Sequence, residues 1–180
     1  MKRCLFLLVV ALPLFFGTAN AQITVQIGQN SPSWIIGPFY SYYPDLFFGN
    51  LVLASDMFAN GAPAGGGKIR AIAYYVPYTY GPNNVIPDMQ WKMGHTANTV
   101  TSGIVQSTDK EIVKTDLDYM PVAYQWNYVT FDQSFHWDGV SNLWIEACYD
   151  DPNNAYYTRK YGYASATYVY PGSNAQFQYG

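Results

Sequence analysis

Residues 138–149 read Asp-Gly-Val-Ser-Asn-Leu-Trp-Ile-Glu-Ala-Cys-Tyr, and this stretch is the strongest indication of the fold class. Asp138-Gly139 is a dipeptide typical of turns, so it marks the end of the preceding secondary-structure element. The run 142–149 that follows has the composition of a core strand. Its alternation puts Leu143, Ile145 and Ala147 on one side of the pleat, and Trp144, Glu146 and Cys148 on the other. The pattern predicts a turn followed by the clearest core strand of the chain.

Similar short segments lie on both sides of this strand, separated by turns rich in Gly, Pro and Asn. The first, 23–27, alternates apolar and polar residues, and 46–53 has the composition of a buried strand. In 68–76, strict alternation groups Ile69, Ala71, Ala73 and Tyr75 on one face. Further strands are expected at 89–93, 101–106, 110–115, 124–131, 156–163 and 166–170. The chain is therefore predicted to be all-β, an antiparallel two-sheet β-sandwich that is jelly-roll-like.

One short helix is expected between two of these strands. Ser55 would be its N-cap, residues 56–59 its single turn, and Gly61 the left-handed residue after its end. The segment 62–67 that follows is a loop. Its three glycines lack the spacing of a phosphate-binding loop, so we expect no phosphate site there.

The first 21 residues have the pattern of a secretory signal peptide. Lys2 and Arg3 give a positive start, residues 4–16 form an apolar run, and 17–21 end in small residues as at a cleavage site. The run is too short to span a bilayer. We expect a mature chain beginning at Gln22 that is secreted or displayed at the cell surface, with one domain over 22–171 and with 172–180 as a linker or truncated end.

Charge excludes two classes of partner. The chain has 9 basic and 12 acidic residues, and loss of Lys2 and Arg3 leaves 7 basic residues, a net charge of −5. This balance argues against nucleic acid and against docking on an anionic membrane. No membrane span is expected. Removal of the signal also leaves a single cysteine, Cys148, for which three states stay open: a buried thiol, a partner in a segment beyond Gly180, or an intermolecular pair.

The sequence offers few groups for catalysis or metal binding. The two histidines, His95 and His136, have no second ligand nearby for zinc, and a triad with Ser141 or Ser134 lacks a nucleophile-elbow pattern. Glycoside hydrolysis needs two carboxylates, and the candidate pairs lie mostly in predicted turns. Glu146 alone lies inside a predicted core strand. For calcium, the candidate ligands are Asp150, Asp151 and Asn153 in an acidic turn.

Tyrosine is the compositional outlier, with 18 residues beside 10 Phe and 5 Trp. Aromatic side chains favour pleated, half-buried surfaces, but a tyrosine also suits recognition because it combines a large ring with a polar tip. Three aromatic segments supply the candidate ligand-binding residues, which are Trp34, Tyr40, Tyr42, Tyr78, Tyr80, Tyr157 and Tyr161.

The stretch 126–148 resembles a pattern found in secreted modular surface proteins of Bacteroidetes-type bacteria. There a W-x-x-x-x-F segment, followed by an aromatic residue, Asp/Asn-Gly, x-Ser-Asn-Leu and a strand ending in Glu, closes an N-terminal jelly-roll-like module. The segments 53–56, 69–74 and 93–96 are similar to further pieces of that module. The resemblance implies an exported module without catalytic residues, often beside fibronectin type III and C-terminal sorting domains. No such second domain is evident in this chain, which leaves open a free-standing module or a fragment of a longer protein.

Together these observations predict a non-catalytic module for adhesion, binding a glycan or an extracellular protein through aromatic stacking and neutral hydrogen bonds. Two alternatives stay open. One is a glycoside hydrolase or an accessory module of one, and the other is a structural spacer domain.

Overall fold

The computed structural model describes residues 22–27, 37–40, 45–80, 85–100, 109–150, 163–165 and 175–179. Its elements are, in chain order, β1 (Ile23–Ile27), β2 (Asp45–Val52), α1 (Ala54–Ala59), β3 (Gly67–Val76), β4 (Tyr78–Tyr80), β5 (Ile86–Thr96), β6 (Glu111–Tyr119), β7 (Gln125–Trp137), β8 (Asn142–Asp150), β9 (Tyr163–Ser165) and β10 (Ala175–Tyr179).

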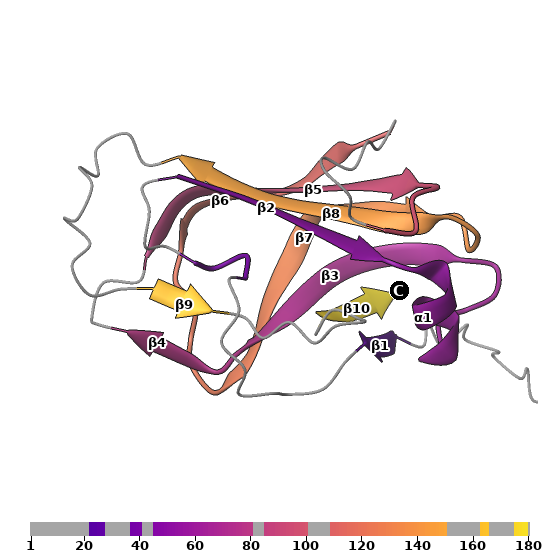
Figure 1. Cartoon of the computed structure of the whole chain (residues 1–180), viewed down its shortest axis with the longest axis horizontal. Helices are drawn as coiled ribbons and strands as arrows, with labels where there is room; N and C mark the ends of the chain where they lie inside the picture. Colours follow the sequence, from indigo (N-terminus) through magenta and orange to yellow (C-terminus); the bar gives the residue numbers. More distant parts are fainter. Residues whose placement is uncertain are drawn as a thin grey trace, which may run out of the picture.

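The strands form two four-stranded antiparallel sheets that lie one over the other (Figure 1). The order is β1-β10-β3-β7 in the first sheet, called sheet A below, and β2-β8-β5-β6 in the second, called sheet B. A separate ribbon pairs β4 with β9. The predicted all-β sandwich of two antiparallel sheets is confirmed. The described residues include no helix long and apolar enough to cross a membrane.

The core lies between the sheets and is built from alternate strand positions. On β8, Leu143, Ile145 and Ala147 point into it, as the sequence predicted. Several aromatic residues are also core residues: the rings of Tyr74 and Trp91 stack with centroids 5.8 Å apart, and Phe39 stacks on Tyr119 at 4.9 Å. Part of the tyrosine excess is therefore structural. Burial raises the pKa of Tyr74 far above its ordinary value, and a hydrogen bond from Asn50 offsets part of this rise.

The two sheets are joined along one edge by β6 and β7. Asp132 of β7 accepts hydrogen bonds from Lys114 Nζ at 2.9 Å and from the Thr115 N–H at 3.3 Å, both on β6. The Lys114 ammonium holds the pKa of Asp132 below its usual range. This contact fixes the position of β7 at the margin of sheet A.

The inward face of β3 differs from the prediction. A register shift between Ile69 and Ala71 marks a β-bulge, and beyond it Ile72, Tyr74 and Val76 enter the core. The predicted grouping of Ile69 with Ala71, Ala73 and Tyr75 is therefore wrong. The strand expected at 46–53 exists as β2, but it is an edge strand rather than a buried one, and Phe47 on it is 61% exposed.

The N-terminus of α1 is capped from another element. Leu53 occupies the N-cap position without a side-chain cap, and Ser55 lies inside the helix, so the expected Ser55 cap is wrong. Instead Asn142 Oδ1 accepts a hydrogen bond from the Ala54 N–H at 2.8 Å. The other end agrees with the prediction, since Gly61 has a φ of +92°.

The loop 62–67 packs against the Asp138-Gly139 turn. A Cβ at Gly66 would collide with the Trp137 carbonyl oxygen and the Gly139 nitrogen, and one at Gly139 would collide with the Gly66 nitrogen. Both glycines also have positive φ, +71° and +74°. The glycines therefore serve the close approach of two turns.

Two boundary predictions concern the chain ends. Residues 172–180 were expected to be a linker or truncated end, whereas 175–179 form β10 between β1 and β3. The predicted signal peptide over 1–21 lies outside the described residues.

Candidate functional site

Most residues that the sequence singled out for ligand binding lie outside the described residues; these are Trp34, Tyr42, Tyr157 and Tyr161. Tyr78 and Tyr80 lie on β4, in register with Ser165 and Tyr163 of β9. Tyr40 is half-buried, and its carbonyl oxygen accepts a hydrogen bond from the Tyr149 hydroxyl at 2.9 Å.

The candidate calcium turn is described only at its first residue. Asp150 ends β8, is exposed, and stands in register with Asp45 of β2. Asp151 and Asn153 lie outside the described residues, so calcium binding there stays a prediction. Elsewhere in the described ranges, no group of three His, Cys, Asp or Glu residues could hold a metal ion.

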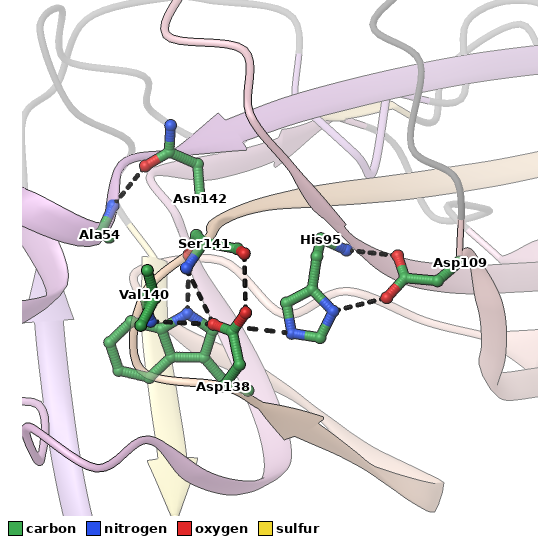
Figure 2. A network of polar contacts seen from close by, with 8 residues as sticks. Ala54, His95, Asp109, Asp138, Val140, Ser141 and Asn142 are labelled. Atoms are coloured by element: carbon green, nitrogen blue, oxygen red, sulfur yellow. Dashed lines mark hydrogen bonds and ion pairs between the residues drawn. The ribbon is translucent and has the colours of Figure 1, made fainter.

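A polar network surrounds His95 at the end of β5 (Figure 2). Asp109 accepts two hydrogen bonds, from the His95 backbone N–H at 2.7 Å and from His95 Nδ1 at 2.5 Å. On the other side of the ring, Nε2 faces Asp138 Oδ1 at 4.0 Å. His95 therefore lies between two carboxylates, one from the β5–β6 connection and one from the β7–β8 turn.

Asp138 is in turn held by its own turn. Its carboxylate accepts hydrogen bonds from the Val140 and Ser141 N–H groups, each at 2.8 Å, and from the Ser141 hydroxyl at 2.7 Å. Partial burial acts to raise the pKa of Asp138, but these bonds and nearby His95 outweigh it and lower the pKa to about 2. Asp138 thus stands between Ser141 and His95, which is not the hydroxyl-to-imidazole contact of a Ser-His-Asp triad.

Asn142 extends this network to α1. Besides capping Ala54, it donates from Nδ2 to the Asn98 carbonyl oxygen at 2.8 Å, and the Trp137 indole N–H donates to the Ser141 carbonyl at 2.8 Å. The stretch 137–142 therefore ties α1, the β5–β6 connection and the β7–β8 turn together. The side chains of Trp137, Asp138 and Asn142 are engaged in hydrogen bonds to backbone groups.

Glu146 forms a second cluster on the outer face of sheet B. It is 3% exposed, and its Oε1 accepts hydrogen bonds from Trp144 Nε1 and Lys110 Nζ, each at 2.7 Å. Lys110 directly precedes β6 and reaches over β5 to β8. The Trp144 ring lies over Gly49, where a Cβ would collide with it. The carboxylate is thus buried, paired with a lysine and hydrogen-bonded to an indole.

A third group of side chains lies on the outer face of sheet A and consists of aromatic residues that are exposed or half-buried. Trp126 and Tyr128 alternate on β7 with buried Asn127 and Val129, so they point away from the core. Tyr128 is 42% exposed. Trp126 contacts Tyr75, its register partner on β3, edge to face with ring centroids 5.9 Å apart.

The turn before β7 carries further exposed apolar side chains. Tyr124 is 77% exposed and Met120 59%. Asn127, itself buried, accepts from the Val122 N–H at 2.7 Å and donates to the Val122 carbonyl at 2.8 Å. The Tyr124 N–H donates to the Val76 carbonyl oxygen at 2.7 Å. These bonds hold a turn of exposed apolar side chains in one conformation.

We call Tyr75, Tyr124, Trp126 and Tyr128 the aromatic surface. The sequence placed Trp126 and Tyr128 on one face of a strand but did not count them among the ligand-binding residues. The signal that could have found them is their alternation opposite Asn127 and Val129, which distinguishes an outward aromatic row from a crowded segment. Comparisons with protein-family models, curated proteins and solved structures found no match to this chain.

Proposed function

We propose that this protein is an exported, non-catalytic binding module that attaches to a glycan or an extracellular protein through the aromatic surface. The observation that carries the proposal is the outward aromatic pair on β7, with Tyr128 42% exposed and Trp126 in contact with Tyr75. Large exposed rings are costly to leave in water, and they supply much contact area for little loss of side-chain entropy.

The preorganised turn supports the same proposal. Asn127 and the Val76 carbonyl fix the backbone of Val122 and Tyr124 before any ligand arrives. A surface that is already ordered loses less conformational entropy on binding. Glu146 is already bonded to Trp144 and Lys110, and His95 is bonded to Asp109 through Nδ1, whereas the aromatic surface presents large rings to solvent, so this surface is the better supported place for recognition.

The test is a binding screen of the full-length chain against immobilised glycans and extracellular proteins such as collagen and fibrinogen. The double variant Trp126→Ala/Tyr128→Ala should weaken the binding that is found at least about tenfold, because each lost ring contact is worth about 1 kcal/mol. Phe47→Ala is the matched control, since Phe47 is an exposed aromatic on the other sheet. Full binding by the double variant would exclude this surface, and a blank screen would favour the spacer.

We infer secretion or surface display from the N-terminal segment. Expression of the full chain in a bacterial host, followed by N-terminal sequencing of the exported fraction, should give a chain that begins at Gln22. Retention of an uncut chain in the cytoplasm would contradict this part of the proposal.

A further inference from the structure

Exposed apolar side chains are concentrated where β6 turns into β7. Met120, Val122 and Tyr124 all lie in this connection and are all exposed, Val122 by 47%. Single exposed apolar residues are ordinary on protein surfaces, whereas several together mark a site of interaction. The connection therefore presents more apolar surface than solubility alone favours.

The start of β5 adds to this surface. Ile86 is in register with Tyr119, so Val85 and Met120 are the next residues of the two strands at the same end of sheet B. Val85 is 37% exposed. We call Val85, Met120 and Val122 the apolar corner. It adjoins the aromatic surface at Tyr124, and together they extend from sheet A to sheet B.

Two carboxylates border the apolar corner. Asp118 is exposed and lies close to Met120 in the sequence. Pro87 is in register with Asp118, so Asp88, the next residue of β5 and also exposed, lies beside it on the neighbouring strand. Among the described residues, neither carboxylate has an ion pair or a side-chain hydrogen bond. Like charges on adjoining strands repel each other, and a cation placed between them removes that repulsion.

The nearest basic residues on these two strands do not supply that cation. On β6, Lys114 already pairs with Asp116 at 3.2 Å and with Asp132 at 2.9 Å. On β5, Lys92 is separated from Asp88 by about 13 Å of strand. The apolar corner and its border therefore combine apolar side chains with negative charge.

This combination favours a protein partner over a sugar. Valine has no hydrogen-bonding group for a sugar hydroxyl, and methionine has only a weak acceptor. Aromatic residues and methionine are instead enriched in protein interfaces, whose cores exclude charge and whose rims are polar. Charged groups at such a rim select a partner of opposite charge and speed its association.

We propose that the partner is a protein segment that packs apolar side chains on the apolar corner and places lysine or arginine beside Asp88 and Asp118. This inference rests on the proposed function and names the partner class for the aromatic surface and the corner that continues it. The corner is already ordered, because Asn127 holds the Val122 backbone by two hydrogen bonds. An ordered surface loses less entropy when the partner binds.

The experiment is calorimetric titration of the full-length protein with three synthetic peptides of equal length. One contains lysine, leucine and tryptophan. In the second, glutamate replaces lysine, and in the third, serine replaces leucine and tryptophan. We expect the first peptide to bind at least about tenfold more tightly than the other two. Raising NaCl from 50 to 500 mM should weaken it about threefold, since exposed charges are screened.

Two variants locate the binding. Val122→Ser should weaken the first peptide about fivefold, because an apolar contact is lost. Its matched control is Val140→Ser, which changes an exposed valine in the β7–β8 turn. Unchanged urea midpoints identify variants that are still folded.

Asp118→Asn should weaken the same peptide about threefold at 50 mM NaCl and have little effect at 500 mM. Its control is Glu111→Gln, at the other end of β6, where the carboxylate is also exposed. Both control variants should bind as the parent protein does.

The outcomes separate this inference from the proposed function. Equal binding of the three peptides, preference for the glutamate peptide, or no binding up to about 1 mM would overturn the cationic, apolar partner. If a glycan binds and is lost only in Trp126→Ala/Tyr128→Ala, the inference fails and the aromatic surface remains the binding site. Binding of the lysine peptide that none of these variants weakens would place the site elsewhere and overturn both.

Discussion

Tyr124 has a backbone conformation that a bulky residue rarely adopts. Its φ is +62°, in the left-handed region, where an L-residue is less stable by about 1–2 kcal/mol. It is also 77% exposed, so core packing does not compensate for this strain. Strained residues of this kind concentrate at functional sites, which agrees with a role for Tyr124 in the aromatic surface.

We therefore predict that Tyr124→Gly stabilises the fold while it weakens binding. Glycine adopts positive φ without a steric penalty but has a more flexible unfolded state, so the net gain should be about 0.5–1 kcal/mol in the free energy of unfolding. Urea denaturation measures it. Tyr124→Ala is the control, because alanine removes the ring and keeps the strain. Equal stability of the two variants would show that the backbone strain is not relieved by glycine.

Removal of the lysine from the Lys110–Glu146 ion pair should lower the stability of the fold. Lys110→Met leaves a carboxylate that is 3% exposed without its cation, and we expect a loss of about 2 kcal/mol, below the range for fully buried pairs because the Lys110 side chain is 33% exposed.

Adding Glu146→Gln to Lys110→Met removes the unpaired charge and should restore about half of that loss. Urea denaturation of the two single variants and the double variant gives the coupling. Additive effects would mean that the two side chains do not interact in solution.

Among the elements, α1 depends on a side chain that lies 88 positions away in the sequence. Asn142→Ala removes the acceptor for the Ala54 N–H and the donor to the Asn98 carbonyl, and should cost about 1–2 kcal/mol. Ser55→Ala, at the position that sequence rules favour as the cap, should change stability by less than about 0.5 kcal/mol. Thermal unfolding of both compares them. A larger effect at Ser55 than at Asn142 would contradict the cap seen here.

Element by element, the sequence predicted what local pattern controls. The strands at 23–27 and 142–149 alternate or are strongly apolar, and the structure contains them as β1 and β8. The inward face of β3 could not be predicted, because a bulge inverts the alternation and the residues around it have no distinctive composition. The predicted Ser55 cap was wrong for a similar reason. The first N–H of the helix bonds to Asn142, which is distant in the sequence, and not to a local side chain.

At the scale of the whole molecule, Asp138 makes stability depend on acidity. Its pKa is about 2 in the folded protein, below the ordinary 3.8, so the folded state favours the carboxylate. The stabilisation is present above about pH 4 and is lost as the pH falls through the folded value. Because the side chain is 43% exposed, solvent screening reduces its size.

Asp138→Asn should therefore be less stable than the parent protein at pH 5 to 7, and the difference should shrink as the pH falls from 4 to 2. Urea denaturation at several pH values follows it. A difference that stays constant over this range would mean that the charge of Asp138 does not contribute.

For the candidate site too, the sequence predicted what local pattern controls and missed what depends on the packing of the whole molecule. Local crowding of tyrosines pointed to segments around residues 40, 78 and 160, but exposure depends on which strands pair and what the partner covers. Tyr74 and Tyr75 are neighbours in the sequence, yet Tyr74 stacks on Trp91 in the core and Tyr75 contacts Trp126 on the outside. The pleat of β3 points these two neighbours to opposite faces, and the packing of the two sheets decides which face is buried.

The position of β10 between β1 and β3 determines when sheet A can be completed. β1 is hydrogen-bonded into the sheet through β10, which comes from residues 175–179. Synthesis proceeds from the N-terminus, so the earliest strand of the sandwich must wait for the latest one. Such distant pairing slows folding, and a nascent chain stalled before residue 175 would leave the amide edges of β1 and β3 bare. Sheet A can therefore be completed only once residues 175–179 have been synthesised, rather than strand by strand from the N-terminus.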